Sequence, residues 1–159
     1  MKPNNNFVTW FRSVAPYVNV FHGRTFVVVF SGEVIADEKP AELFHDFNVL
    51  ASLCVRLVLV HGAPPQIDSR LKERKLHPEY VKGARVTDAL TLQFVKETIG
   101  RVRFEIEALL SMELSNPPIA NSAVRIANGN FITAHPIGVE DGMDLMYSKV
   151  RKVDAESIR

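Results

Sequence analysis

The chain has 159 residues, 47% of them hydrophobic, and a formal net charge of +1, which suits one domain or one large lobe of a bigger domain. Lysine and arginine are interspersed with aspartate and glutamate, so no basic patch indicates a nucleic-acid surface. No apolar stretch approaches the ~20 residues that a membrane-spanning helix needs, and the N-terminus lacks the apolar core of a signal peptide. We therefore expect a cytoplasmic protein that binds neither nucleic acid nor membranes.

The first predicted element is an amphipathic helix, which we treat as a separate N-terminal segment of residues 1–22. Its apolar positions recur at steps of three and four. Pro16 lies among them, which predicts a kinked helix or two short helices. The apolar stripe consists of Phe7, Trp10, Phe11, Val14, Val18 and Phe21.

Strands and helices alternate in the next part of the chain. The run FVVVF (26–30) and residues 55–60 are short and rich in β-branched side chains, which predicts two buried strands. Residues 41–53 form an amphipathic helix between them, and Cys54 is expected to be a small buried thiol. Pro64 and Pro65 suit the first turn of a further helix that ends near Lys75. This order predicts a right-handed parallel α/β unit with a sheet covered on its faces.

The second half begins with HPEYVKGARVTD (77–88), in which Gly83 predicts a hairpin. Thr87 or Asp88 is expected to cap a long helix that ends near Met112. Its apolar positions fit either core packing or a helix pair across an interface; they are Leu92, Val95, Ile99, Val102, Ile106 and Leu109. Three strand-like stretches joined by Asn-Gly and Asp-Gly turns follow in residues 124–153.

The end of the chain resembles the start of a helix with Asp154 as its N-cap. A single helical turn is not stable alone, so we expect the chain to be a piece of something longer. No catalytic residue is predicted, because Asp68 and Glu33 lack a paired carboxylate at a spacing that suggests acid–base chemistry. No metal site is predicted either, because His135 has no second ligand at a metal-type spacing.

Three segments together resemble the amino-acid kinase family, and within it the acetylglutamate kinases and the N-acetylglutamate synthases. They are FVVVFSGEVI (26–35), VLVHGAPPQID (58–68) and YVKGARVTD (80–88). The resemblance extends over essentially the whole chain in order and spacing. It implies a three-layer α/β/α sandwich with a mainly parallel central sheet, the carbamate kinase-like fold. Residues 23–159 would form the first, N-terminal lobe of such a domain.

The sequence departs from the kinase pattern at the phosphate loops. The kinases carry a lysine and two glycines with their first strand and a His-Gly-Gly-Gly turn after the second. Here Val29 stands in place of the lysine and Ser31 in place of the first glycine, while Ala63 and Pro64 replace two glycines of the turn. Phosphoryl transfer needs a cation and preorganised donors, and proline has no N–H to donate. The departures therefore predict that the turn keeps the shape of a phosphate-binding loop but does not support phosphoryl transfer.

A degenerate, kinase-type ligand site would retain Gly32, Gly62 and Arg85. In the kinases the corresponding arginine binds a substrate carboxylate; in this chain Arg85 suits either that role or a structural ion pair. His61 is expected to be structural. Tyr17 is the candidate for contact with an effector, because the related proteins lay their N-terminal helix against bound arginine; plain packing is the alternative.

The departures match the N-acetylglutamate synthases, whose kinase-like domain does not phosphorylate. In that family a separate C-terminal domain transfers the acetyl group of acetyl-CoA to glutamate, the first step of arginine biosynthesis. The kinase-like domain binds arginine and builds a homo-oligomer, a hexamer. We therefore expect a non-catalytic regulatory and oligomerisation portion with no cofactor of its own, lacking the second lobe and the acetyltransferase domain. The alternatives are a phosphotransferase lobe of the acetylglutamate kinase type and a stand-alone interaction module.

Overall fold

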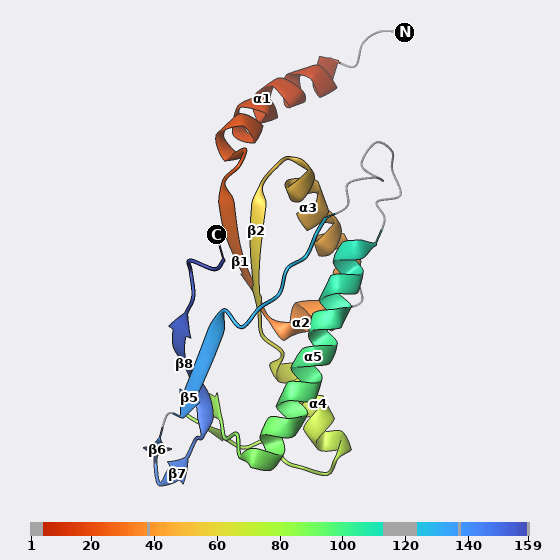
Figure 1. The fold of residues 1–159 in the computed structure, drawn as a ribbon. Coiled ribbons are helices and arrows are strands. Elements are labelled where there is room, and N and C mark those ends of the chain that lie inside the picture. Colours follow the sequence, from red (N-terminus) through yellow and green to blue (C-terminus); the bar gives the residue numbers. More distant parts are fainter. Residues whose placement is uncertain (1–4, 38, 113–123, 137, 159) are drawn as a thin grey trace.

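The computed structural model describes residues 5–37, 39–112, 124–136 and 138–158. One parallel pair of strands lies at the centre of the N-terminal half (Figure 1). Strand β1 (Thr25–Phe30) pairs with β2 (Arg56–His61), and helix α3 (Pro40–Ser52) connects them on one face. Helices α2 (Gly32–Ile35) and α4 (Pro64–Glu73) begin just after the two strands end. The predicted alternation of strands and helices is confirmed.

Helices cover one face of the β1–β2 pair. Successive side chains of a strand point to opposite faces, so Val28 and Phe30 pack on the core while Val27 and Val29 are 64% and 73% exposed. The expectation that 26–30 is a buried strand is therefore wrong for one of its two faces. Within the described residues, the helices form one of the two outer layers that a three-layer sandwich contains (Figure 1).

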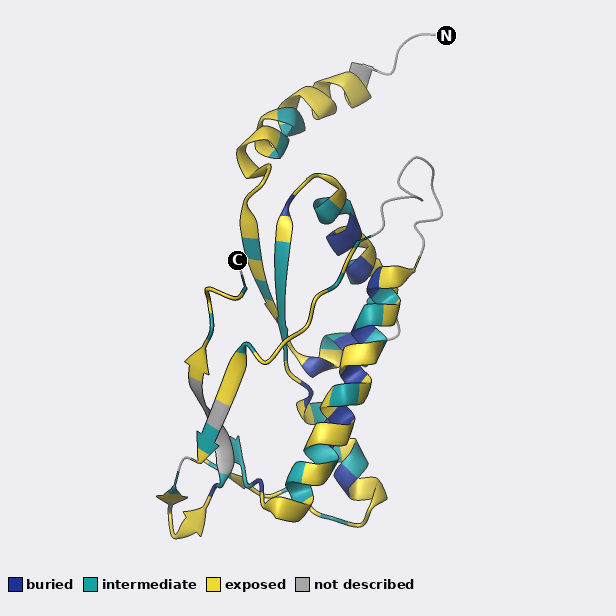
Figure 2. Ribbon diagram, viewed as in Figure 1, coloured by how far each residue is buried: buried dark blue, intermediate teal, exposed yellow. Residues whose placement is uncertain are grey.

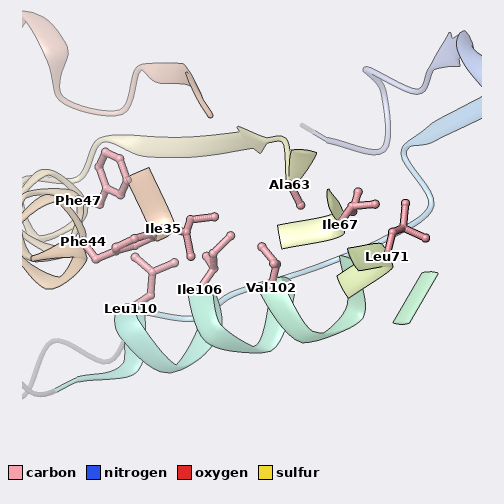
Figure 3. Close-up of a cluster of buried hydrophobic side chains, with 9 residues drawn as sticks. All are labelled: Ile35, Phe44, Phe47, Ala63, Ile67, Leu71, Val102, Ile106 and Leu110. Atoms are coloured by element: carbon pink, nitrogen blue, oxygen red, sulfur yellow. The ribbon is translucent and has the colours of Figure 1, made fainter. Parts of the chain in front are cut away.

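The hydrophobic core lies between this sheet and helix α5 (Ala89–Ser111) (Figures 2 and 3). Every fourth residue of α5 turns inward, so Thr98, Val102 and Ile106 are buried, whereas Ile99 is 44% exposed, contrary to the predicted stripe. Burying one large apolar side chain contributes roughly 1.5–3 kcal/mol. The core cluster comprises Ile35, Phe44, Phe47, Ala63, Ile67, Leu71, Val102, Ile106 and Leu110.

Helix α1 (Asn5–Phe21) projects away from the rest of the chain and contains Pro16 (Figure 1). Its aromatic side chains remain in solvent: Phe7, Trp10 and Phe11 are 60%, 59% and 56% exposed. The ring of Phe7 lies 6.1 Å from those of both neighbours. Figure 2 shows the helix as mostly exposed along its length. The aromatic cluster therefore packs on itself and not on the core.

The second half of the described chain is built from short antiparallel pairs. Strands β3 (Tyr80–Val81) and β4 (Ala84–Arg85) form the predicted hairpin, and β6 (Val139–Glu140) and β7 (Met143–Asp144) form a second. Strand β5 (Ile132–Pro136) pairs with β8 (Tyr147–Val153). The two hairpins meet at their tips, where Lys82 Nζ lies 3.3 Å from Asp141 Oδ1.

Three local expectations need correction or refinement. Cys54 is exposed, because the chain turns there with a φ of +63° and Val55 takes the buried position. Residues 124–128 form no strand; Ile126 packs against the core instead. Asp154 makes the contact of an N-cap, since its Oδ1 accepts the N–H of Ser157 at 3.2 Å, but residues 155–158 form a turn and not the expected helix. Among the described helices, none has both the length and the apolarity needed to cross a membrane.

Candidate ligand site at the ends of the parallel strands

The two turns after β1 and β2 lie side by side. Because the strands are parallel, their carboxyl ends meet at the same edge, with Phe30 opposite His61. The N–H of Gly62 donates to the Phe30 carbonyl at 3.3 Å. His61 stacks on Phe30 with ring centroids 6.0 Å apart, and its buried Nδ1 has no hydrogen-bond partner among the described residues. The geometry brings Gly32 and Gly62 to one edge, as a phosphate-binding fold requires.

The two turns are closed onto each other. A Cβ atom added to Gly32 would meet Ala63 Cα and Pro65 Cδ at 3.0 Å and Gln66 Oε1 at 2.5 Å. The Nε2 of Gln66 donates to the Gly32 carbonyl at 2.6 Å, which joins the start of α2 to the first turn of α4. Protein atoms therefore occupy the space beside Gly32.

The electrostatics of this edge do not suit an anion. The N-cap of α4 is Ala63, which offers no side-chain cap, and Pro64 and Pro65 have no N–H group to donate. On the other turn, a hydrogen bond from the Ser31 side chain lowers the pKa of the Glu33 carboxyl, which favours its negative form. Val29 points to the open face of the sheet and carries no charge. Neither turn supplies the cation that a phosphate would need.

Arg85 lies over the first two turns of α4. Lys82 and Gly83 have φ angles of +48° and +82°, which is typical of a type I′ turn, and the resulting register places Tyr80 opposite Arg85. Arg85 Nη1 donates to Asp68 Oδ1, and its Nη2 lies 3.4 Å from the Pro64 carbonyl oxygen. The side chains of Arg85 and Asp68 are 11% and 26% exposed. Of the two roles considered for Arg85 from the sequence, the structural ion pair is therefore present.

Tyr80 completes this cluster. Its hydroxyl lies 2.9 Å from both carboxylate oxygens of Asp68, and the Arg85 guanidinium carbon lies 5.1 Å from its ring centroid. Partial burial, and then the hydrogen bond to Asp68, raise the pKa of Tyr80, so the hydroxyl remains a donor at neutral pH. Sequence analysis missed Gln66, Asp68 and Tyr80 as members of the site. The available signal was the position of two polar residues within the first two turns of α4, next to the loop.

Tyr17 lies apart from the other candidate residues. It is on α1, near the amino end of β1, whereas the turns containing Gly32 and Gly62 follow the carboxyl ends (Figure 1). The side chain is 63% exposed and stacks on Phe21 with centroids 6.5 Å apart. The structure thus brings Gly32, Gly62 and Arg85 together and leaves Tyr17 accessible at the opposite end.

A groove of about 470 Å³ lies on the helical side, between α2, α4 and α5. Its charged side chains are paired with one another: Arg70 contacts Glu73 at 3.1 Å and Glu97 at 3.5 Å, and Arg101 contacts Glu105 at 2.9 Å. Within the described residues, no three His, Cys, Asp or Glu side chains are grouped as metal ligands. We therefore assign no ligand to this groove.

Comparison with known proteins places this geometry in a family. The model of the amino acid kinase family matches residues 24–159. The chain belongs to the amino acid kinase family, and the α/β fold class predicted from the sequence is confirmed.

The relatives within this family carry a more specific name. The chain is 46% identical over 155 residues to an amino-acid acetyltransferase of Ectopseudomonas mendocina, and 44% identical over 157 residues to one of Edwardsiella ictaluri. These alignments cover 97% and 98% of this chain but 36% of each relative. The chain thus spans about a third of the length of the relatives that it matches.

Two solved structures share its fold. N-acetylglutamate synthase of Neisseria gonorrhoeae, in complex with coenzyme A and L-arginine, matches with a TM-score of 0.84 and 37% identity. The same enzyme with coenzyme A and N-acetyl-glutamate matches with a TM-score of 0.79 and 36% identity. Both comparisons cover 96% of this chain, and 36% and 34% of the enzyme chain.

Proposed function

We propose that the chain is the N-terminal regulatory and oligomerisation portion of an N-acetylglutamate synthase. The enzyme transfers the acetyl group of acetyl-CoA to L-glutamate, and the rest of the protein would bind both substrates and catalyse the transfer. This chain would hold no cofactor. The observation that carries the proposal is the closed pair of turns at Gly32 and Ala63, which lacks a cation and has two prolines at the start of α4. It occurs in a chain related to acetyltransferases along nearly its whole length.

The proposed effector is L-arginine, which is bound in one of the Neisseria structures. Tyr17 is the candidate contact, because its ring is exposed on α1 and a phenol suits both stacking on a guanidinium and hydrogen bonding to it. The aromatic cluster of α1 would join copies of the chain into a homo-oligomer, a hexamer by the family resemblance. We place the protein in the cytoplasm, where arginine synthesis would meet its end product.

The test is an acetyl-transfer assay of the full-length protein, in which the rate is measured from the free thiol that coenzyme A gains when it loses the acetyl group. We expect arginine to change the rate, and we expect a version lacking residues 1–159 to transfer acetyl groups without responding to arginine. Tyr17→Ala should shift the arginine response to concentrations at least about tenfold higher, a loss of ~1.4 kcal/mol of binding free energy. Val20→Ala, at an exposed position on the same helix, should leave the response in place. A truncated version that still responds to arginine would refute the regulatory assignment.

A further inference from the structure

The β3–β4 and β6–β7 hairpins are joined at two places. At their tips, Lys82 Nζ lies 3.3 Å from Asp141 Oδ1. At their bases, an isolated parallel bridge joins Thr87 to Met146, each of which lies two residues after the second strand of its hairpin. Figure 1 shows β6 and β7 at one end of the β5–β8 pair. The two hairpins are therefore connected at both ends.

The connection at the bases is the buried one. The side chains of Lys82 and Asp141 are 63% and 62% exposed, and ion pairs in solvent stabilise a protein only slightly. Beside the bridge, in contrast, Leu145 is 0% exposed and Thr87 is 5% exposed. The main core cluster of the described residues does not include Leu145. This side chain therefore indicates a small second core under the hairpins, which should hold them together more strongly than the ion pair does.

The backbone around Leu145 is fixed by hydrogen bonds on both sides of the residue. The N–H of Leu145 donates to the Gly138 carbonyl at 3.1 Å, which closes the β6–β7 hairpin. The N–H of Met146 donates to Asp144 Oδ1 at 3.0 Å. Met146 has a φ of +51°, a conformation that costs free energy for a residue other than glycine and persists where neighbouring contacts enforce it. These contacts hold Leu145 in its buried position.

The bridge at the bases lies close to the Arg85 ion pair. Thr87 follows Arg85 by two residues, and Arg85 contacts Asp68 of α4. On the other side of the bridge, Met146 directly precedes β8. A short stretch of backbone therefore connects the start of β8 with the Arg85–Asp68 pair.

We propose that the two hairpins open and close as one unit anchored by Leu145, so that Arg85 separates from Asp68 only when the Leu145 side chain also leaves its buried position. The unit is a conformational device within this chain that couples the start of β8 to the Arg85–Asp68 pair. It goes beyond the proposed function and does not depend on it, because it requires neither an effector nor acetyl transfer.

Hydrogen exchange of the full-length protein tests this coupling. Residues 79–86 report on the first hairpin, residues 138–146 on the second, and residues 98–106 of α5 on global unfolding. Leu145→Ala should speed exchange of the first hairpin at least about thirtyfold, equivalent to ~2 kcal/mol, although the substitution lies in the second. Asp68→Asn should speed exchange of the second hairpin about tenfold, equivalent to ~1.4 kcal/mol, because coupling between two sites is reciprocal.

Three further variants serve as controls. Val139→Ala changes a residue of the second hairpin that is 68% exposed, and it should alter exchange of neither hairpin. Asp141→Asn removes the ion pair at the tips and should speed exchange of both by less than about fivefold, equivalent to ~1 kcal/mol. If Leu145→Ala also speeds exchange of residues 98–106, the milder Leu145→Val replaces it and should speed exchange of both hairpins while leaving α5 unchanged.

Three results would overturn the proposal. The first is a Leu145 variant that speeds exchange of the second hairpin alone, and the second is an Asp68→Asn variant that speeds exchange of the first hairpin alone. Either result would mean that the hairpins open independently. The third is an Asp141→Asn variant with as large an effect as Leu145→Ala, which would make the ion pair at the tips, and not Leu145, the anchor.

Discussion

Two glycines of this chain lie in opposite surroundings and give opposite predictions. Gly32 touches Ala63, Pro65 and Gln66 where a side chain would stand, whereas a Cβ at Gly100 on α5 meets no atom within 4 Å. Gly32→Ala should therefore force the turns apart and destabilise the chain by about 1–3 kcal/mol. Gly100→Ala should stabilise it by about 0.5–1 kcal/mol. Urea unfolding measures both, and a Gly32→Ala variant as stable as wild type would show that the turns are not closed.

Asp88 caps α5, and its effect on stability should depend on pH. Its carboxylate accepts the N–H of Thr91 at 2.7 Å. Hydrogen bonds from the side chain and then the backbone of Thr91 lower the pKa of Asp88. A lowered folded-state pKa means that the stabilisation is present above the unfolded pKa, about 3.9, and is lost as pH falls through the folded value.

Replacement of Asp88 should lower the free energy of unfolding by different amounts at two pH values. Asp88→Ala should cost about 1 kcal/mol of unfolding free energy at neutral pH. The deficit relative to wild type should shrink at about pH 3, below the unfolded pKa, because the unfolded wild-type chain takes up a proton there more readily than the folded carboxylate, and the variant has no such group. Denaturant unfolding at both pH values measures it. An equal deficit at the two values would mean that the Asp88 charge does not contribute.

The Arg85 ion pair shows what the sequence can and cannot predict about a single residue. Positive φ at Lys82 and Gly83 follows from a recognisable turn, so the hairpin was predictable. The partner of Arg85 was not, because Asp68 lies 17 residues earlier, on a different element. Sequence analysis assessed Asp68 only as a candidate acid or base. Its role as a partner depends on how the hairpin folds back over α4, which no local pattern contains.

Helix α1 was predictable as an element because its apolar period is clear. The sequence does not say what covers an apolar stripe: a core, a second copy and solvent give the same period. In the structure, the stripe is exposed and the rings of Phe7, Trp10 and Phe11 cluster together. Exposed aromatic clusters of this kind mark interaction sites.

Self-association through α1 has a convenient reporter, since Trp10 is the single tryptophan of the chain. We expect its fluorescence to shift to the red on dilution, as indole rings leave an interface and enter water. Phe7→Ala combined with Phe11→Ala should lower the mass seen by light scattering, because each buried Phe contributes roughly 1.5–3 kcal/mol. Val139→Ala, at another exposed apolar position, is the control. Equal masses for wild type and the double variant would contradict this role of α1.

Strand β1 shows the corresponding limit for a sheet. Its run of β-branched residues indicated a strand, and the structure has one from Thr25 to Phe30. A run that is apolar at every position also indicates burial on both faces. Val27 and Val29 are exposed here because helices α2, α3, α4 and α5 contribute to the core on the other face. The local sequence thus predicts that these residues form a strand. Burial of the second face would need another layer of helices, which the described residues do not provide.

At the level of the whole molecule, we expect this chain to belong to the family without the ability to phosphorylate. The fold retains the parallel strands, the two turns and the hairpin of the amino acid kinase family. The chemistry needs more than this arrangement, because charge on a transferring phosphoryl group must be met by a cation and aligned donors. Val29 carries no charge and the two prolines have no N–H to donate, so we expect this chain to retain the fold without the chemistry.

Phosphoryl transfer by the full-length protein is therefore the decisive assay. The protein is given ATP, magnesium and N-acetylglutamate, and ADP and acyl phosphate are measured. Loss of one electrostatic contact to a transition state costs ~3–4 kcal/mol, about 10²–10³ in rate, so the combined losses should leave no detectable turnover. Val29→Lys alone should not restore it, because Pro64 and Pro65 still lack donors. Sustained formation of ADP and acyl phosphate would contradict the non-phosphorylating assignment and make an acetylglutamate kinase the better description.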